Sequence, residues 1–121
     1  MQQSPVNLEK KLALFSEHWS PRVIAEMNDC QFKLVKLAGE FVWHSHTDTD
    51  ETFLCLEGEF DIQLRDRTVT LHAGELFVVP KGVAHRPVAP AECHVLLIEL
   101  RGVVNTGDAD DRQAAENDVW V

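Results

Sequence analysis

Three histidines and one glutamate are spaced so that together they could bind a metal ion. His44 and His46 are separated by one residue, and side chains two positions apart on a β-strand point to the same face. Glu51 follows a polar turn, so a hairpin would place its carboxylate opposite both imidazoles. His85 follows a proline–glycine turn at the end of another strand. This donor set suits one divalent first-row transition metal ion, such as Fe(II), Mn(II), Ni(II), Co(II) or Zn(II).

Such a ligand set would leave coordination positions of the metal ion open for a reaction. Four protein ligands on an ion that prefers six leave open positions for water or substrate, and an open position distinguishes a catalytic site from a structural one. A single His-x-His pair is weak support, and a glutamate at the start of a strand is usually solvated. Asp50 is a rival to Glu51 as the carboxylate ligand. The prediction therefore depends on the combination of all four residues.

Short strands must position these side chains. Apolar or alternating runs that stop at turn residues cover 31–37, 41–46, 51–56, 59–64, 68–71, 75–79 and 93–100. Many short strands separated by turn signals about every 8–12 residues are typical of an all-β sandwich or barrel. We therefore expect the metal ligands to converge inside a β-barrel.

The spacing of the ligands resembles the two motifs of the cupin family. The matching positions are Gly39-(x4)-His44-x-His46-(x4)-Glu51-(x6)-Gly58 and Gly74-(x5)-Pro80-x-Gly82-(x2)-His85. The first motif has four residues after its glycine where the family usually has five, which questions the turn at Gly39. The resemblance implies an all-β double-stranded β-helix, a jelly-roll barrel of two antiparallel sheets. It also implies that His44, His46, Glu51 and His85 are the metal ligands, and that the barrel is often dimeric.

Three segments are predicted along the chain. Residues 1–30 would form a short helix over 8–16, capped by Asn7, and a strand over 23–27 that packs on the barrel. Residues 31–104 would form the cupin barrel. Residues 105–121 hold five acids and one base, and we expect a mobile acidic tail there.

Strand parity predicts which residues line a pocket around the ion. With His44 and His46 facing inward, Val42 would face inward too, and Phe53 and Cys55 would follow from Glu51. Trp43 would then face outward, so we expect it under the N-terminal segment or in a subunit interface.

The parity of residues 93–100 is open. We favour the register that turns Leu96 and Ile98 into the pocket together with His94 and Leu100, because the opposite register would bury Glu99. If Glu99 faces inward instead, it becomes a candidate general base.

Composition excludes several classes of function. The 121-residue chain has 11 Lys and Arg against 20 Asp and Glu, a net charge of -9, and no basic stripe. We therefore predict neither a nucleic-acid partner nor a membrane partner. Three cysteines without framework spacing and a start that lacks a signal-peptide pattern favour reduced thiols and a cytoplasmic location.

The sequence thus predicts a small cupin, a homodimer, that binds one divalent metal ion and a small-molecule ligand. The resemblance is to short mannose-6-phosphate-isomerase-like or dioxygenase-like cupins, which implies a metal-dependent oxidoreductase or isomerase. The alternative is a non-catalytic metal- or sugar-binding cupin with a sensing or storage role, and a metal-free barrel ranks last. The catalytic residues are not identified beyond three candidates for acid–base work: Glu99, His94 and Cys55.

Overall fold

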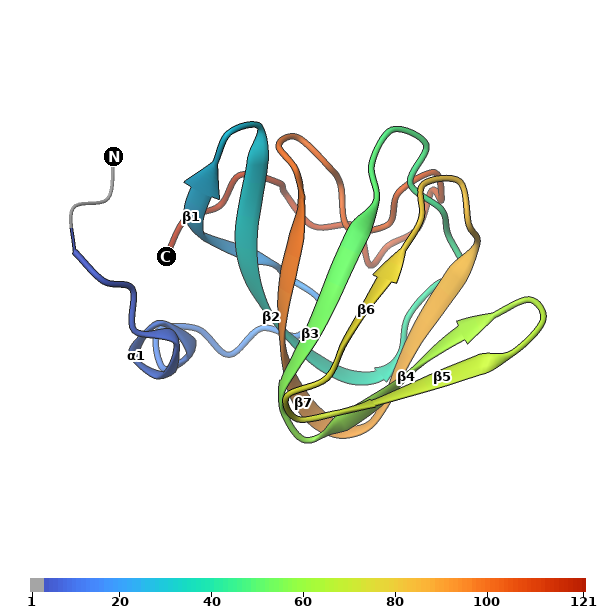
Figure 1. The fold of residues 1–121 in the computed structure, drawn as a ribbon, viewed down its shortest axis with the longest axis horizontal. Helices are drawn as coiled ribbons and strands as arrows, with labels where there is room; N and C mark the ends of the chain where they lie inside the picture. The colour runs from blue at the N-terminus through green and yellow to red at the C-terminus, as the bar shows by residue number, and fades with distance from the viewer. Residues whose placement is uncertain (1–3) are drawn as a thin grey trace.

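The computed structural model describes residues 4–121, which form one short helix and seven β-strands (Figure 1). The helix is α1 (Leu8–Leu12). The strands are β1 (Arg22–Met27), β2 (Cys30–Glu40), β3 (Glu51–Glu57), β4 (Glu59–Leu64), β5 (Thr68–His72), β6 (Leu76–Val79) and β7 (His85–Leu100). The predicted all-β class with a short N-terminal helix is confirmed.

Two long strands, β2 and β7, build both sheets of the barrel. The second half of β7 pairs with β2 on one side and with β3 on the other, and β1 and β6 extend this sheet. The first half of β7 pairs with β4, which pairs with β5, so the same strand also enters the second layer. Every strand pair is antiparallel. This arrangement is the predicted jelly roll, in which two sheets bury one core between them.

The core lies between the sheets and is built from the inward side chains of both layers. Phe53, Phe60, Ile62 and Val95 are almost completely buried there. A second, smaller cluster lies on the outside of β2, where Phe15 covers outward-facing apolar residues of the sheet. Because both faces of this sheet carry apolar side chains, hydrophobicity alone does not reveal which face is inside.

The N-terminal segment follows the sequence prediction in type but not in length. The Asn7 side chain accepts a hydrogen bond from the Lys10 N–H at 2.9 Å, as an N-cap residue should. The helix ends at Leu12, four residues before the predicted end. Phe15 lies beyond the helix and is buried against the sheet. It matched the spacing of apolar residues in the predicted helix, but a turn and not a helix brings it to the sheet.

Residues 41–46 do not form the predicted strand. β2 ends at Glu40 after a register shift near Gly39, which has a φ of +80°. The following segment has one isolated bridge, between His44 and His85. The non-regular backbone explains why strand parity fails there: Phe41, not Val42, is buried.

The acidic tail contacts the barrel at several places along its length. Asp108 accepts hydrogen bonds from the backbone N–H and the hydroxyl of Ser45, at 2.7 and 3.1 Å. Near the end, Val23 donates to the carbonyl of Val119 at 2.7 Å, and Val121 donates back to Val23 at 3.2 Å. The tail therefore lies on the barrel where the sequence predicted a mobile extension. Within residues 4–121 no helix has the length and apolar character to cross a bilayer.

Candidate metal centre

All four predicted metal ligands meet inside the barrel. His44 and His46 come from the non-regular segment after β2, Glu51 is the first residue of β3, and His85 is the first residue of β7. One donor atom from each lies within 4.8 Å of the others, and all four side chains are buried. Asp50, the rival carboxylate, is exposed and accepts a hydrogen bond from the backbone N–H of Lys81. The geometry therefore favours Glu51 over its neighbour.

Two of the imidazoles are oriented by backbone carbonyls. Nδ1 of His44 donates to the carbonyl of Val42, and Nδ1 of His85 donates to the carbonyl of Val83, both at 2.9 Å. Because a carbonyl can only accept, each ring carries its proton on Nδ1 and keeps the Nε2 lone pair free. This is how histidine ligands are commonly held for a metal ion.

The third imidazole has an unsatisfied nitrogen. Nε2 of His46 is buried and has no hydrogen-bond partner, although it lies 3.3 Å from Oε1 of Glu51. The same carboxylate oxygen lies 3.3 Å from Nε2 of His85. A buried polar atom without a partner is costly. A cation between these donors would satisfy it, so the residues present fit a metal ion.

The electrostatics favour a neutral imidazole beside a charged carboxylate. Burial, assisted by the neighbouring His85, lowers the pKa of His44 to about 4. Burial alone would raise the pKa of Glu51, but the adjacent His46 and His85 hold it well below its usual range. Metal ligands must be deprotonated to bind. Both groups are therefore in their binding forms at neutral pH.

The favoured parity of residues 93–100 is wrong. Glu99 faces inward and is 3% exposed, whereas Leu96 packs outward against the N-terminal cluster and Ile98 lies on the outer face. Lys33 on the neighbouring strand β2 explains why a buried carboxylate is tolerated: its Nζ lies 3.0 Å from Oε1 of Glu99. A partner on another strand cannot be read from the run 93–100 alone. Leu96 and Ile98 therefore do not line the pocket.

Glu99 is buried close to the Glu51 carboxylate. Burial and the charge of Glu51 raise the pKa of Glu99 well above its usual range. The other two acid–base candidates lie elsewhere. His94 contacts Glu57 and Glu92 at the barrel surface. Of the three, Glu99 is the one whose pKa is shifted by the charge of a predicted ligand.

Cys55 and Trp43 have distinct surroundings. Cys55 is buried, as predicted, but its Sγ faces Sγ of Cys93 at 3.8 Å and not the cavity described below. Trp43 is half-buried, with the guanidinium of Arg65 3.9 Å from its ring centre. The indole that the N-terminal segment does contribute to the interior is Trp19, which stacks on Phe41 with ring centres 4.6 Å apart.

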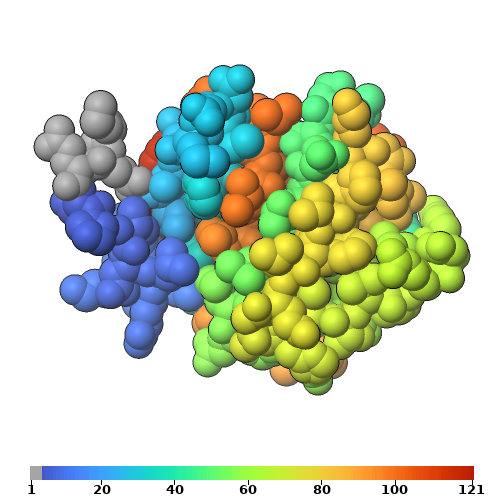
Figure 2. Space-filling view, viewed as in Figure 1, coloured from blue at the N-terminus to red at the C-terminus, as the bar shows by residue number. Residues whose placement is uncertain are grey.

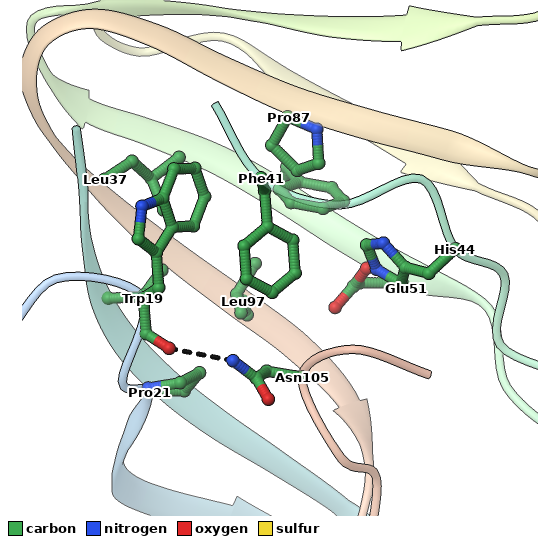
Figure 3. Close-up of a pocket in the computed structure, with 11 residues that line it drawn as sticks. Trp19, Pro21, Leu37, Phe41, His44, Glu51, Pro87, Leu97 and Asn105 are labelled. Carbon is green, nitrogen blue, oxygen red and sulfur yellow. Dashed lines mark hydrogen bonds between the residues drawn. The ribbon is translucent and has the colours of Figure 1, made fainter. Parts of the chain in front are cut away.

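A small cavity of about 30 Å³ adjoins the metal ligands, with His44 and Glu51 at one end (Figure 3). Phe53, predicted from parity, lines it, and Val42 does not. Sequence analysis missed Trp19 and Asn105, which come from the two chain ends. Neither residue lies in a motif that would predict a place in the cavity wall, because only the folded barrel brings these distant parts of the chain to the cavity.

Comparison with known proteins agrees with this geometry. The sequence model of the cupin domain matches residues 33–99, which include every strand that supplies a candidate ligand. The chain belongs to the cupin-domain family. The match ends before the C-terminal tail, so the family describes the barrel and not the segment beyond residue 99.

Solved structures and a curated sequence resemble this barrel. A cupin-2 domain protein from Shewanella frigidimarina is 59% identical with a TM-score of 0.78, over 79% of this chain and 94% of its own. Protein NMB1881 from Neisseria meningitidis is 39% identical with a TM-score of 0.74, over 80% of this chain and 99% of its own. The uncharacterized protein YdbB from Bacillus subtilis is 44% identical over 64 residues, 52% of this chain and 57% of YdbB. The matched part thus spans little more than half of YdbB.

Proposed function

We propose that this cupin binds one divalent first-row transition metal ion and acts as an enzyme on a small organic molecule, in a reaction of the dioxygenase or isomerase type. The observation that carries the proposal is the buried cluster of His44, His46, Glu51 and His85, whose donor atoms lie within 4.8 Å of one another. When bound, the ion would act as a Lewis acid at its open positions, or with Fe(II) would permit oxygen chemistry.

Different residues around the site would orient the metal ligands and carry a proton. The carbonyls of Val42 and Val83 fix two imidazole rings, so that little reorganisation is needed when the ion binds. Glu99 would be the group that holds or moves a proton, because it is buried close to Glu51 and one of its oxygens, Oε2, has no hydrogen-bond partner. Lys33 keeps Glu99 facing inward through their 3.0 Å ion pair.

The alternative is a non-catalytic cupin that senses or stores a metal ion or a sugar. The inward Glu99 favours the enzyme, because a mere storage site needs no acid–base group beside its ligands. Replacing Glu99 with Gln separates the two proposals: the shape is kept, while the ability to exchange a proton is lost. An enzyme would lose turnover with its metal content intact, whereas a binding protein would keep its function.

Elemental analysis of tag-free protein tests the metal site directly. We expect about one equivalent of a first-row metal in the parent protein and a loss of most of it in His44→Ala and Glu51→Ala. His72→Ala is the matched control, because His72 is exposed and far from the cluster in sequence. A parent that takes up no metal even from Fe(II), Mn(II), Ni(II), Co(II) and Zn(II) solutions would refute the proposal.

We also infer that the active form is a homodimer joined through the outer face of the large sheet. Leu54 pairs with Leu76 and with Leu96 across neighbouring strands, and Val78 and Ile98 flank them. Leu76 is 60% exposed and Val78 is 44% exposed; Figure 2 looks onto this face, where β6 lies beside β3. In a twofold contact, residues near the axis meet their own copies. An uncharged contact surface avoids placing like charges face to face when two copies of a chain of net charge -9 associate.

Sedimentation equilibrium tests the dimer. Leu76→Glu would place two like charges in the contact and should shift the protein to a monomer. Met27→Glu is the control, since Met27 is 55% exposed on β1, at the opposite end of the sheet order. A monomeric parent, or a Leu76→Glu protein that stays dimeric, would show that this face is not the interface.

A further inference from the structure

Two cysteines face each other in the core of the barrel. Sγ of Cys55 on β3 lies 3.8 Å from Sγ of Cys93 on β7, and both side chains are 0% exposed. Both are free thiols, as is the half-buried Cys30. Cys30 pairs with Leu100 and Cys93 pairs with Leu37, at opposite ends of the register that joins β2 to β7. Cys55 and Cys93 therefore form a pair that Cys30 cannot reach in the folded barrel.

The backbone holds the two thiols in this position. β3 and the second half of β7 are paired antiparallel strands that lie side by side (Figure 1). Cys55 lies opposite Val95, and a register shift before Glu57 brings the next turn close to Cys93. A Cβ on Gly58 would lie 3.5 Å from the Cα of Cys93. Because both cysteines belong to hydrogen-bonded strands, the distance between their sulfurs does not depend on a flexible loop.

Little movement would join the two sulfurs. A disulfide bond is about 2.05 Å long, so atoms that lie 3.8 Å apart have to approach by about 1.8 Å. Sγ is the only heavy atom of the side chain beyond Cβ, so rotation about χ1 of both residues brings the sulfurs together without moving the backbone. The reaction also removes both thiol hydrogens. The core therefore gains no volume, and its apolar neighbours are not overpacked.

Burial determines when the pair can react. It raises the pKa of Cys55, and it raises the pKa of Cys93 to about 12. The thiolate is the reactive form of cysteine, so both thiols stay inert while the core is closed. Residues 57–59, just after Cys55, and residues 90–92, just before Cys93, are exposed. Local opening at this end of the barrel would admit water and a small oxidant to the sulfurs.

We propose that Cys55 and Cys93 are a redox-active pair, which hydrogen peroxide or another small uncharged peroxide oxidises to a disulfide that ties β3 to β7. One sulfur attacks a peroxide oxygen as the O–O bond breaks, which gives a sulfenic acid and, from hydrogen peroxide, one water. The second sulfur attacks the sulfenic sulfur and forms the S–S bond. The hydroxyl group leaves as a second water with the proton of the second thiol. Each sulfur thus loses one electron, and the peroxide is reduced to water.

The disulfide would tighten the barrel. Its ends lie 38 positions apart, and β4, β5 and β6 lie between them. A cross-link over a loop of this length removes conformational entropy from the unfolded chain and should raise the melting temperature by about 10 °C. None of the predicted metal ligands takes part in the reaction, so the pair is independent of the proposed function.

Peptide mapping tests the bond directly. Metal-free Cys30→Ser protein would be treated with hydrogen peroxide in the presence of a chelator and digested with trypsin without reduction. The two thiols fall in separate tryptic peptides, 37–65 and 82–101, because proline follows Arg86. We expect mass spectrometry to find these peptides joined, and to find them separate after dithiothreitol. Both peptides still reduced after prolonged exposure, or sulfinic acid formed separately on each, would overturn the assignment.

Thermal unfolding of the same samples tests whether the barrel accommodates the bond. The oxidised protein should melt about 10 °C above the reduced protein, and dithiothreitol should abolish the difference. The matched control is Cys30→Ser with Cys93→Ala, which keeps Cys55 in the core but removes its partner. Peroxide should produce neither the joined peptides nor the rise in this control. The same rise in the control, or a lower melting temperature after oxidation, would refute a disulfide that fits the fold.

Discussion

Replacing His44 with Gln should change how the stability of the metal-free protein depends on pH. His44 is buried, and burial lowers its pKa from 6.5 to about 4. The unfolded chain therefore takes up a proton on this residue at a higher pH than the folded protein does. The contribution of His44 to the free energy of unfolding is therefore fully present above pH 6.5, and it is lost as the pH falls from 6.5 to about 4.

The size of the effect follows from the two pKa values. At pH 7 the linkage costs almost nothing, because the residue is neutral in both states. At pH 5 the unfolded chain is mostly protonated and the folded chain is not, so the free energy of unfolding is lower by about 2 kcal/mol. A glutamine at this position has no such linkage, so the variant should lose about 2 kcal/mol less than the parent between pH 7 and pH 5.

Urea unfolding in the presence of a chelator measures this difference. Both proteins would be unfolded at pH 7, 6 and 5, and the gap between their stabilities should narrow as the pH falls. His72→Gln is the control: His72 is exposed and lies outside the ligand cluster, so this variant should not reproduce the change seen in His44→Gln. Parallel curves for the parent and His44→Gln would refute the idea that burial keeps His44 neutral.

Three further outcomes are expected. Metal affinity should fall as the pH drops toward about 4, where the buried His44 imidazole takes up a proton; unchanged metal content below that pH in equilibrium dialysis would contradict a histidine site. Lys33→Met should lower the free energy of unfolding by about 3 kcal/mol in urea, because it leaves the buried Glu99 carboxylate without its partner. The double variant Lys33→Met with Glu99→Leu should recover most of this loss. Equal stability of the two variants would contradict a role for the ion pair. In the native protein a thiol reagent should modify Cys30 first, because Cys55 and Cys93 are buried and burial raises the pKa of Cys93 to about 12; equal rates at all three would contradict this.

Local patterns in the sequence determined the fold family and the candidate ligands. The spacing of His44, His46, Glu51 and His85 was sufficient to predict the ligand set. It depends on the alternation of side chains along a strand and on two turns, which are both local properties of the chain. The seven strand signals were likewise local, apart from the segment 41–46. There the backbone leaves the sheet at Gly39, so the parity that placed Val42 in the pocket no longer applied.

Only the tertiary structure decided which face of β7 is inside. Both faces of this strand carry apolar residues, and the choice depends on Lys33, which meets Glu99 from 66 positions away along the chain. The ends of the chain posed the same difficulty. Trp19 and Asn105 are ordinary residues of a turn and a tail until the barrel brings them together over the metal ligands. Contacts between distant segments have no local signature, because they arise from how the sheets close and not from the order of residues.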